Sequence, residues 1–271
     1  MRLIPLLFVL LLQTGAVLGE EAVSLKGQLI QGGIIIGKTA PGSQILLDGQ
    51  ALRVSAVGDF VFGFDRDAEP QALLTVIAPG QAPLIQKLEI ARRDYDIQKI
   101  EGVEQKYVSP PKEVTERISR DAQLVAAARK DDIDKPMFAS GFSWPAQGRI
   151  SGVYGSQRVF NGVPKRPHYG VDVAAPVGTP ILAPAEGIVT LAEPDLYYSG
   201  GTVILDHGHG LSSTFLHMDS VTVRVGEYLK SGDQLGTLGA TGRVTGPHLD
   251  WRMNWFEQRV DPQTLVEAMP Q

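Results

Sequence analysis

The histidines of this chain are confined to one stretch. The sequence has 271 residues and no cysteine, and all five histidines lie between His168 and His248. Without thiolates, imidazole nitrogens and carboxylate oxygens are the side-chain groups that can hold a divalent metal. A hydrolytic metal site needs such ligands, an open position for water, and unliganded groups that move the proton of that water. This part of the chain contains all of these groups.

The first candidate pair is His168 and Asp172, four residues apart in the segment His-Tyr-Gly-Val-Asp. Val171 and Val173 flank the acid, which predicts a strand. Residues i and i+4 of a strand share a face but lie about 13 Å apart when fully extended, so a kink or bulge at Gly170 is needed before both could reach one ion. Taken alone, this pentapeptide is more typical of a surface histidine followed by a turn aspartate than of a metal site.

The second candidate pair is His248 and Asp250, which point to the same side of a strand because they are two residues apart. Between the two pairs lies His217, in an apolar Phe-Leu-His-Met run. His207 and His209 also have same-face spacing but belong to a glycine-rich turn. We expect these two to be structural or to support the metal ligands from behind, with either one as a substitute ligand if Asp250 does not bind the metal.

Taken together, the stretch from Gly152 to Trp255 resembles the lysostaphin-type, or LytM-like, zinc metallopeptidases, which cut peptide bonds in bacterial cell walls. The resemblance covers somewhat over a third of the chain. It implies a β-barrel-like sheet with a groove for an extended peptide. The motifs that carry it are His168-x-x-x-Asp172, Gly178–Thr179–Pro180, Ala183 to Gly187, Phe215-x-His217, Gly239-x-Thr241–Gly242 and Gly246–Pro247–His248–Leu249.

This resemblance assigns roles to the candidate residues. His168 and Asp172 would be zinc ligands, and His217 and His248 would be the unliganded pair that orients the water and the developing oxyanion. An imidazole suits that task because it titrates near neutral pH. Asp250 departs from the family pattern, which usually has a second histidine there. Because a carboxylate binds zinc at about 2.0–2.2 Å, we predict Asp250 as the third ligand.

The aspartate at position 250 changes the expected strength of the site. Two carboxylates would neutralise the formal charge of a divalent ion and weaken its pull on bound water. We therefore expect a zinc endopeptidase for peptidoglycan stem or cross-bridge peptides with reduced activity. The alternative is a catalytically silent module that activates another cell-wall hydrolase. A third class, a lipoyl-type carrier barrel, is suggested by Ala183 to Gly187, but no lysine lies at a hairpin tip beside it.

Residues 1–19 have the layout of a secretory signal peptide. They carry one charge, at Arg2, and an apolar run from Leu3 to Leu12 that is well short of the ~20 residues needed to span a bilayer. We expect cleavage after Gly19 or Ala16. The chain is thus predicted to be periplasmic or secreted, with no membrane span after cleavage.

The charge of the mature chain bears on its partners. Loss of Arg2 takes the formal net charge from −5 to −6. This excess of acidic residues argues against nucleic acid as a partner.

Three segments are expected after the signal peptide. Turn residues between short apolar stretches predict strands and hairpins over residues 20–105. Phe60, Phe62 and Phe64 alternate there, which puts their rings on one sheet face, so we expect an immunoglobulin-like β-sandwich. It has no histidine, and we assign it no chemistry.

The second segment, residues 106–137, is a linker with a connecting helix. Ser109, before two prolines, is a typical helix start, and apolar residues at helical spacing continue to about Lys130. We expect this helix to pack on one domain, with coverage of the groove as the alternative. Residues 138–271, the third segment, alternate β-type runs with glycine-rich turns, which predicts an antiparallel β-barrel-like domain.

Aromatic and basic residues near the motifs have simpler expectations. Trp251, Trp255 and Phe256 are expected in the core, because aromatic residues beside a strand usually pack. Arg158 and Arg166 are expected on the solvated surface, with contact to a substrate carboxylate as the alternative.

Overall fold

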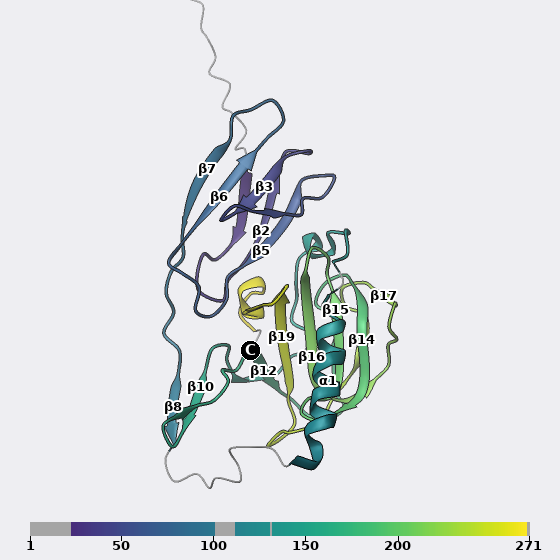
Figure 1. The fold of residues 1–271 in the computed structure, drawn as a ribbon. Helices are drawn as coiled ribbons and strands as arrows, with labels where there is room; N and C mark the ends of the chain where they lie inside the picture. The colour runs from purple at the N-terminus through teal and green to yellow at the C-terminus, as the bar shows by residue number, and fades with distance from the viewer. Residues whose placement is uncertain (1–22, 101–111, 131, 270–271) are drawn as a thin grey trace, which may run out of the picture.

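The computed structural model describes residues 23–100, 112–130 and 132–269 (Figure 1). The predicted signal peptide, residues 1–19, lies outside the described residues. So do residues 106–111, the first part of the predicted linker. Within them the chain is mostly β with one α-helix, which confirms the predicted fold class, although the largest sheet is open and does not close into a barrel. No helix of the described ranges is long and apolar enough to cross a membrane.

Two antiparallel sheets form the N-terminal sandwich. One has the order β1 (Val23–Gly27), β2 (Ile34–Thr39), β5 (Asp59–Gly63); the other has the order β4 (Gln50–Leu52), β3 (Gln44–Leu47), β6 (Gln71–Ile77), β7 (Leu84–Glu89). The three phenylalanines are buried, as expected for a sandwich core. The rings of Phe60 and Phe62 stack with centroids 6.2 Å apart, and Phe64 meets Phe62 edge-on.

A small sheet joins distant parts of the chain. It consists of β8 (Ile97–Ile100), β10 (Gln157–Phe160) and β11 (Val163–Pro164). After β7 the chain runs along the molecule in an extended stretch, and β8 then pairs in parallel with β10 (Figure 1). This pairing places a strand from before the linker beside the loop that leads to His168.

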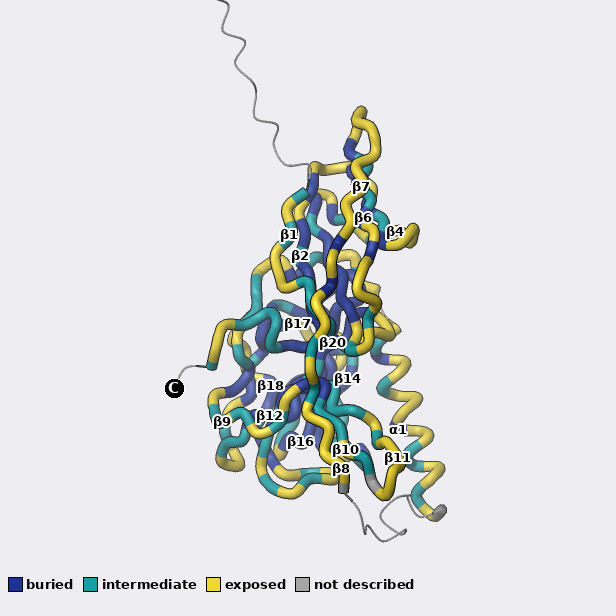
Figure 2. The backbone as a smooth tube through the Cα atoms, turned by 90° about the vertical axis from the view of Figure 1, so that its left-hand side faces the viewer, coloured by how far each residue is buried: buried dark blue, intermediate teal, exposed yellow. Residues whose placement is uncertain are grey.

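The large sheet has ten strands. Its main order is β17 (Tyr228–Leu229), β14 (Gly187–Leu196), β15 (Gly200–Asp206), β16 (Leu211–Val221), β19 (Leu249–Trp255), β12 (Gly170–Ala174), β9 (Arg149–Gly152). In addition, β13 (Pro180–Leu182) pairs with β18 (Gln234–Leu238), β18 also pairs with β16, and β20 (Gln258–Val260) pairs with β19. The strands of this sheet form much of the buried interior in Figure 2.

The two faces of the large sheet differ in chemistry. Val203, Phe215, Trp251 and Val171 are cross-strand neighbours on one face, and all four are fully buried in the core. The next residues along these strands point to the other face, because side chains alternate. That second face carries Arg252 and, along the same strands, both aspartates of the candidate site.

The helix α1 (Thr115–Ala127) packs on this second face. Val125 contacts a buried cluster that includes Leu191 and Ile204, and the Asp121 carboxylate accepts a 2.8 Å hydrogen bond from the backbone N–H of Tyr197. In Figure 1 the helix lies in front of the β14 to β16 part of the sheet. It is shorter than predicted, and its expected start at Ser109 lies outside the described residues.

Short 3-10 helices occur at Lys112–Val114, Met137–Ser140 and Pro262–Leu265. The last of these, η4, follows the contact between the sandwich and the large sheet. A Cβ atom on Gly63 of β5 would lie 2.7 Å from Val260, so the two parts touch directly there. The domain boundaries at 105 and 138 remain predictions.

The expectation for the aromatic residues holds in part. Trp251 and Trp255 are buried, as expected. The prediction for Phe256 was wrong, because it is 44% exposed. Phe256 has a positive φ of 48° in the turn after β19, and its ring covers Gly210, where a Cβ atom would lie only 2.5 Å away.

Candidate metal centre

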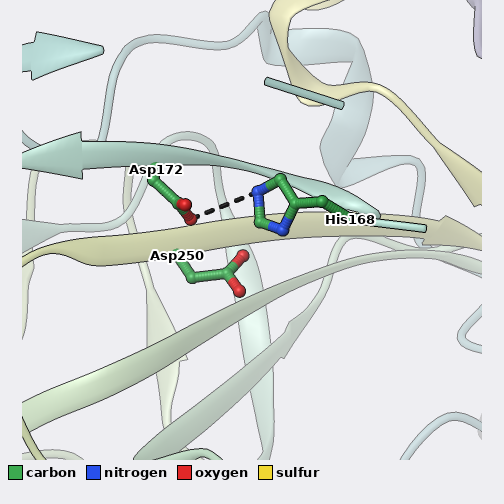
Figure 3. A group of neighbouring side chains, drawn as sticks. All are labelled: His168, Asp172 and Asp250. Carbon is green, nitrogen blue, oxygen red and sulfur yellow. Dashed lines mark ion pairs between the residues drawn. The ribbon is translucent and has the colours of Figure 1, made fainter. Parts of the chain in front are cut away.

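Three side chains converge on the second face of the large sheet (Figure 3). His168, Asp172 and Asp250 each offer one ligand atom, and these atoms all lie within 4.8 Å of one another. Asp172 and Asp250 face each other directly in the antiparallel pairing of β12 with β19. The structure thus brings together the three residues that the sequence singles out as ligands.

His168 reaches this cluster because it precedes the regular strand. Its backbone N–H donates to the carbonyl of Ser156 at 2.8 Å, and its carbonyl accepts from Gly155 at 2.7 Å. The strand β12 begins only at Gly170, and its pairing with β9 is irregular between Asp172 and the next residue. The break needed to bring His168 and Asp172 together therefore comes from the loop before β12.

Two glycines leave room for the carboxylates. A Cβ atom on Gly152 would lie 2.2 Å from Oδ2 of Asp172, and one on Gly170 would lie 2.4 Å from Oδ1 of Asp250. Any side chain at either position would displace an aspartate. The two glycines therefore allow the neighbouring backbone to approach the two carboxylates closely.

The ligand atoms suit a divalent cation. Nε2 of His168 lies 3.2 Å from Oδ1 of Asp172, yet both atoms are buried and neither has a hydrogen bond to any described residue. Burial opposes protonation of His168, but its contact with Asp172 and the charge of Asp250 outweigh burial and raise its pKa. Buried polar atoms without partners are costly, and a cation among them would satisfy both.

Arg252 is a functional neighbour that the sequence reasoning missed. Its Nε donates to both carboxylate oxygens of Asp250 at 3.0 Å, and its Nη2 donates to Oδ2 at 2.5 Å. Burial opposes ionisation of Asp250, but the guanidinium outweighs it and lowers the pKa of this carboxyl. The sequence could have indicated this contact through the spacing of Asp250 and Arg252, because residues two apart lie on one face of a strand.

This guanidinium changes the charge of the candidate site. With a divalent ion, two carboxylates alone would give a formal charge of zero, and Arg252 restores one positive charge. That is the charge of a site with two histidines and one aspartate. From the sequence we expected the two aspartates to weaken the pull of the metal ion on bound water. That expectation did not include the positive charge of Arg252, which compensates for one of them.

His217 and His248 lie side by side next to the cluster. Their ring centroids are 4.9 Å apart, and Nε2 of His248 lies 3.9 Å from Oδ1 of Asp172. Nδ1 of His217 is 2.9 Å from the carbonyl of Thr241, and Nδ1 of His248 is 2.9 Å from that of Gly246. Because a carbonyl only accepts, Nδ1 carries the hydrogen, and Nε2 of each neutral ring keeps a lone pair.

The backbone fixes the position of His217. Its φ of 65° lies in the left-handed region, which is uncommon outside glycine, and its N–H donates to the carbonyl of Ser199 at 2.8 Å. Burial is the main cause that lowers the pKa of His217, so the ring is neutral at neutral pH. A strained residue held this way is typical of a functional site.

His207 and His209 do not belong to this cluster. They lie in the turn between β15 and β16, where Leu211 pairs with Trp255, whereas Leu216 pairs with Asp250. Five strand residues separate these two positions, or about 17 Å. Neither histidine can therefore replace Asp250 as a ligand, contrary to the expectation from the sequence.

His207 instead forms part of a buried hydrogen-bond chain. Its Nδ1 donates to the carbonyl of Glu186 at 2.7 Å, so its Nε2, 2.8 Å from Oγ of Ser213, is the acceptor. Ser213 in turn accepts from Nε1 of Trp251 at 3.3 Å. Complete burial lowers the pKa of His207 to about 4.

We expect this buried imidazole to make the fold less stable in acid. Its pKa is lower in the folded chain than in the unfolded one, so the unfolded state binds more protons as the pH falls from about 6.5 to about 4. His207 should therefore reduce the free energy of unfolding by roughly 2–3 kcal/mol between pH 7 and pH 4.5. Urea unfolding of the wild type and of His207→Gln at both pH values measures this, and an equal pH dependence in the two proteins would contradict it.

Comparison with known proteins places this geometry in a family. Residues 166–262 match the model of Peptidase family M23. Peptidoglycan DD-endopeptidase ShyA of Vibrio cholerae is 36% identical over 107 residues, which cover 39% of this chain and 24% of that protein. The match thus spans about a quarter of the length of this relative.

One solved structure shares the fold over most of the chain. The crystal structure of a candidate peptidase M23 from Pseudomonas aeruginosa has a TM-score of 0.64 at 27% identity, covering 88% of this chain and 95% of that one. The catalytic domain of the antimicrobial peptidase lysostaphin from Staphylococcus simulans is 30% identical, with 43% of this chain and 90% of that chain covered and a TM-score of 0.39. Residues 166–262 of this chain, which contain the convergent side chains, are a domain of peptidase family M23.

Proposed function

We propose that this chain is a zinc-dependent endopeptidase that cuts peptide bonds in peptidoglycan. The observation that carries the proposal is the convergence of His168, Asp172 and Asp250, two of which have buried ligand atoms without hydrogen bonds, beside two imidazoles with free Nε2 atoms. The substrate class follows the printed activity of ShyA, a peptidoglycan DD-endopeptidase. Such a substrate agrees with the predicted periplasmic or secreted location.

In this proposal His168, Asp172 and Asp250 would hold the zinc ion. When bound, zinc would supply a Lewis acid for the peptide carbonyl and for the attacking water. The protein itself supplies the bases. Nε2 of neutral His217 or His248 accepts a proton from the attacking water, and the protonated ring then donates it to the leaving amine. The second ring donates a hydrogen bond to the developing oxyanion when protonated.

The test of this function is metal content together with cleavage. Protein purified without chelator is expected to carry about one zinc per chain and to cut peptidoglycan-derived cross-linked peptides. The double variant His168→Ala, Asp172→Ala is expected to lose both properties. Metal analysis and chromatography of the peptide products measure the two. Full zinc occupancy in the double variant would refute this site.

A second candidate is a catalytically silent module that activates another cell-wall hydrolase. The engagement of both Asp250 oxygens by Arg252 favours it, because a carboxylate held this firmly by a guanidinium is a poorer metal ligand. This alternative predicts that the folded wild-type chain neither retains zinc nor cuts peptides, yet stimulates a second wall hydrolase in a mixed assay. Cleavage by the purified chain alone would exclude it.

A further inference from the structure

Basic side chains gather beside the candidate metal centre, on the same face of the large sheet. Arg252 lies on β19, and its neighbour across to β16 is Thr214. Arg129, just after α1, donates from Nη2 to Oγ1 of Thr214 at 2.9 Å. Arg259 on β20 lies opposite Asn254 and donates from Nη1 to its side-chain oxygen at 3.1 Å. Arg129 therefore lies beside Arg252 across the sheet, and Arg259 lies next to Asn254, two residues beyond Arg252 and further from Asp250 along β19.

Two of these arginines lack a counterion. Arg252 is engaged by Asp250, but no carboxylate among the described residues lies within 4.0 Å of Arg129, Arg259 or the nearby Arg166. Nε of Arg129 is buried and has no hydrogen-bond partner in the described chain. Burial, followed by mutual repulsion, lowers the pKa of Arg129 to about 9 and that of Arg259 to about 10.

Unpaired cations in a partly buried position oppose folding, so their presence points to a ligand that neutralises them. Arg166 and Arg259 line a cavity of about 430 Å³ that extends this region toward the sandwich. Three acids also line it, namely Asp65, Asp67 and Glu257. Asp67 is paired with Arg66 at 2.9 Å. Glu257 lies close enough to raise the pKa of Arg129 and Arg259 slightly against burial, but it forms no ion pair with either of them within 4.0 Å.

We propose that Arg129, Arg166 and Arg259 form a subsite for a carboxylate of the peptide substrate. The inference rests on the proposed peptidase function and adds a determinant of its specificity. Guanidinium groups bind carboxylates through paired, charge-assisted hydrogen bonds, and these are strong where water is partly excluded.

The geometry also sets the position of that carboxylate in the substrate. Along β19, Arg252 lies about 7 Å and Asn254 about 14 Å from Asp250, at 3.4 Å per residue. A peptide extended along this strand advances by the same amount per residue. Its recognised carboxylate therefore lies about two to four residues from the bond that is cut.

The test compares two synthetic peptides that differ only in a free carboxyl or a carboxamide at that distance from the scissile bond. The wild type is expected to cut the acid with a KM about 10- to 100-fold lower than that for the amide, the range for a charged hydrogen-bonded pair. Arg129→Gln and Arg259→Gln should lose most of this preference while kcat for the amide stays unchanged. Arg224→Gln, which removes an exposed arginine from the turn before β17, is the matched control and should retain the preference.

Binding of the same peptides to chelator-treated full-length protein separates this inference from the proposed activity. Calorimetry should show that the acid binds more tightly than the amide, and that Arg259→Gln abolishes the difference, even if no peptide is cut. Equal binding of acid and amide by the wild type would overturn the subsite, whatever the activity. If a glutamine variant melts at a lower temperature, Arg129→Lys and Arg259→Lys replace it. These keep the charge but lose the paired geometry, and an undiminished preference in both would also overturn the subsite.

Discussion

His217→Ala and His248→Ala proteins are expected to turn over about 10²–10⁴ times more slowly than the wild type while their zinc content stays the same. Each ring donates Nδ1–H to a backbone carbonyl and keeps Nε2 beside the ligand cluster. That arrangement suits proton transfer and leaves the three candidate ligands untouched. Steady-state kinetics on a cross-linked peptide, together with metal analysis of each variant, measure the two quantities.

His209→Gln is the control for these variants. It removes an imidazole of the same domain, in the distant turn before β16, where the ring packs against Phe138 with centroids 5.2 Å apart. Turnover should be unchanged. Loss of zinc from either His217→Ala or His248→Ala would show that the affected residue is a ligand, and the assignment of roles would have to be exchanged.

Asp250→Ala is expected to lose zinc and also to destabilise the fold, because it leaves the partly buried guanidinium of Arg252 without its partner. Breaking a buried ion pair from one side costs about 3–5 kcal/mol of unfolding free energy. Loss of zinc affinity should exceed the roughly 10- to 100-fold typical of an outer-shell residue, since Asp250 contacts the metal directly in our proposal. Chelator competition and thermal unfolding of the metal-free protein measure the two effects.

The partner variant separates these two roles of Asp250. The double variant Asp250→Ala, Arg252→Ala should regain much of the stability of the metal-free protein but not the zinc affinity, because the uncompensated cation is gone while the ligand is still missing. Arg252→Gln alone should keep zinc with reduced turnover, because the site loses a positive charge. Undiminished zinc binding and cleavage in Asp250→Ala would show that Asp250 is not a ligand.

Asp250 and Arg252 together determine whether position 250 can accept the histidine that is usual in the family. Asp250→His alone would place an imidazole against an unpaired guanidinium, and it should bind zinc poorly. Asp250→His combined with Arg252→Gln removes that conflict and keeps one positive charge with the ion. If the single variant binds zinc as tightly as the double variant, Arg252 has no influence on the metal.

The spacing of residues within short segments was sufficient to predict many strands and part of the candidate site. Alternation at Phe60 to Phe64 indicated a buried strand, and the spacing of His248 and Asp250 placed both on one strand face. The pairing of β12 with β19 could not be derived in the same way, because register depends on contacts between residues about 80 positions apart. This pairing brings Asp172 opposite Asp250.

Other features needed the three-dimensional arrangement. The parallel pairing of β8 with β10 joins segments separated by the linker and leaves no periodic signal in the sequence. The contact of Arg129 with Thr214 likewise depends on how α1 docks on the sheet. His207 has same-face spacing with His209 as a ligand pair would, and only its complete burial and its two hydrogen bonds identify it as structural.

The contact between the sandwich and the large sheet has a consequence for modularity. Val260 is fully buried near Gly63, and Asp261, itself buried, is paired with Arg93 at 2.8 Å between Nη1 and Oδ2. A fragment that begins at residue 138 would expose Val260 and leave Asp261 without Arg93. It would also leave β10 without its partner strand β8. Residues 138–271 therefore depend on the preceding part of the chain for these contacts. A fusion protein that uses this segment would have to include the sandwich and β8 as well.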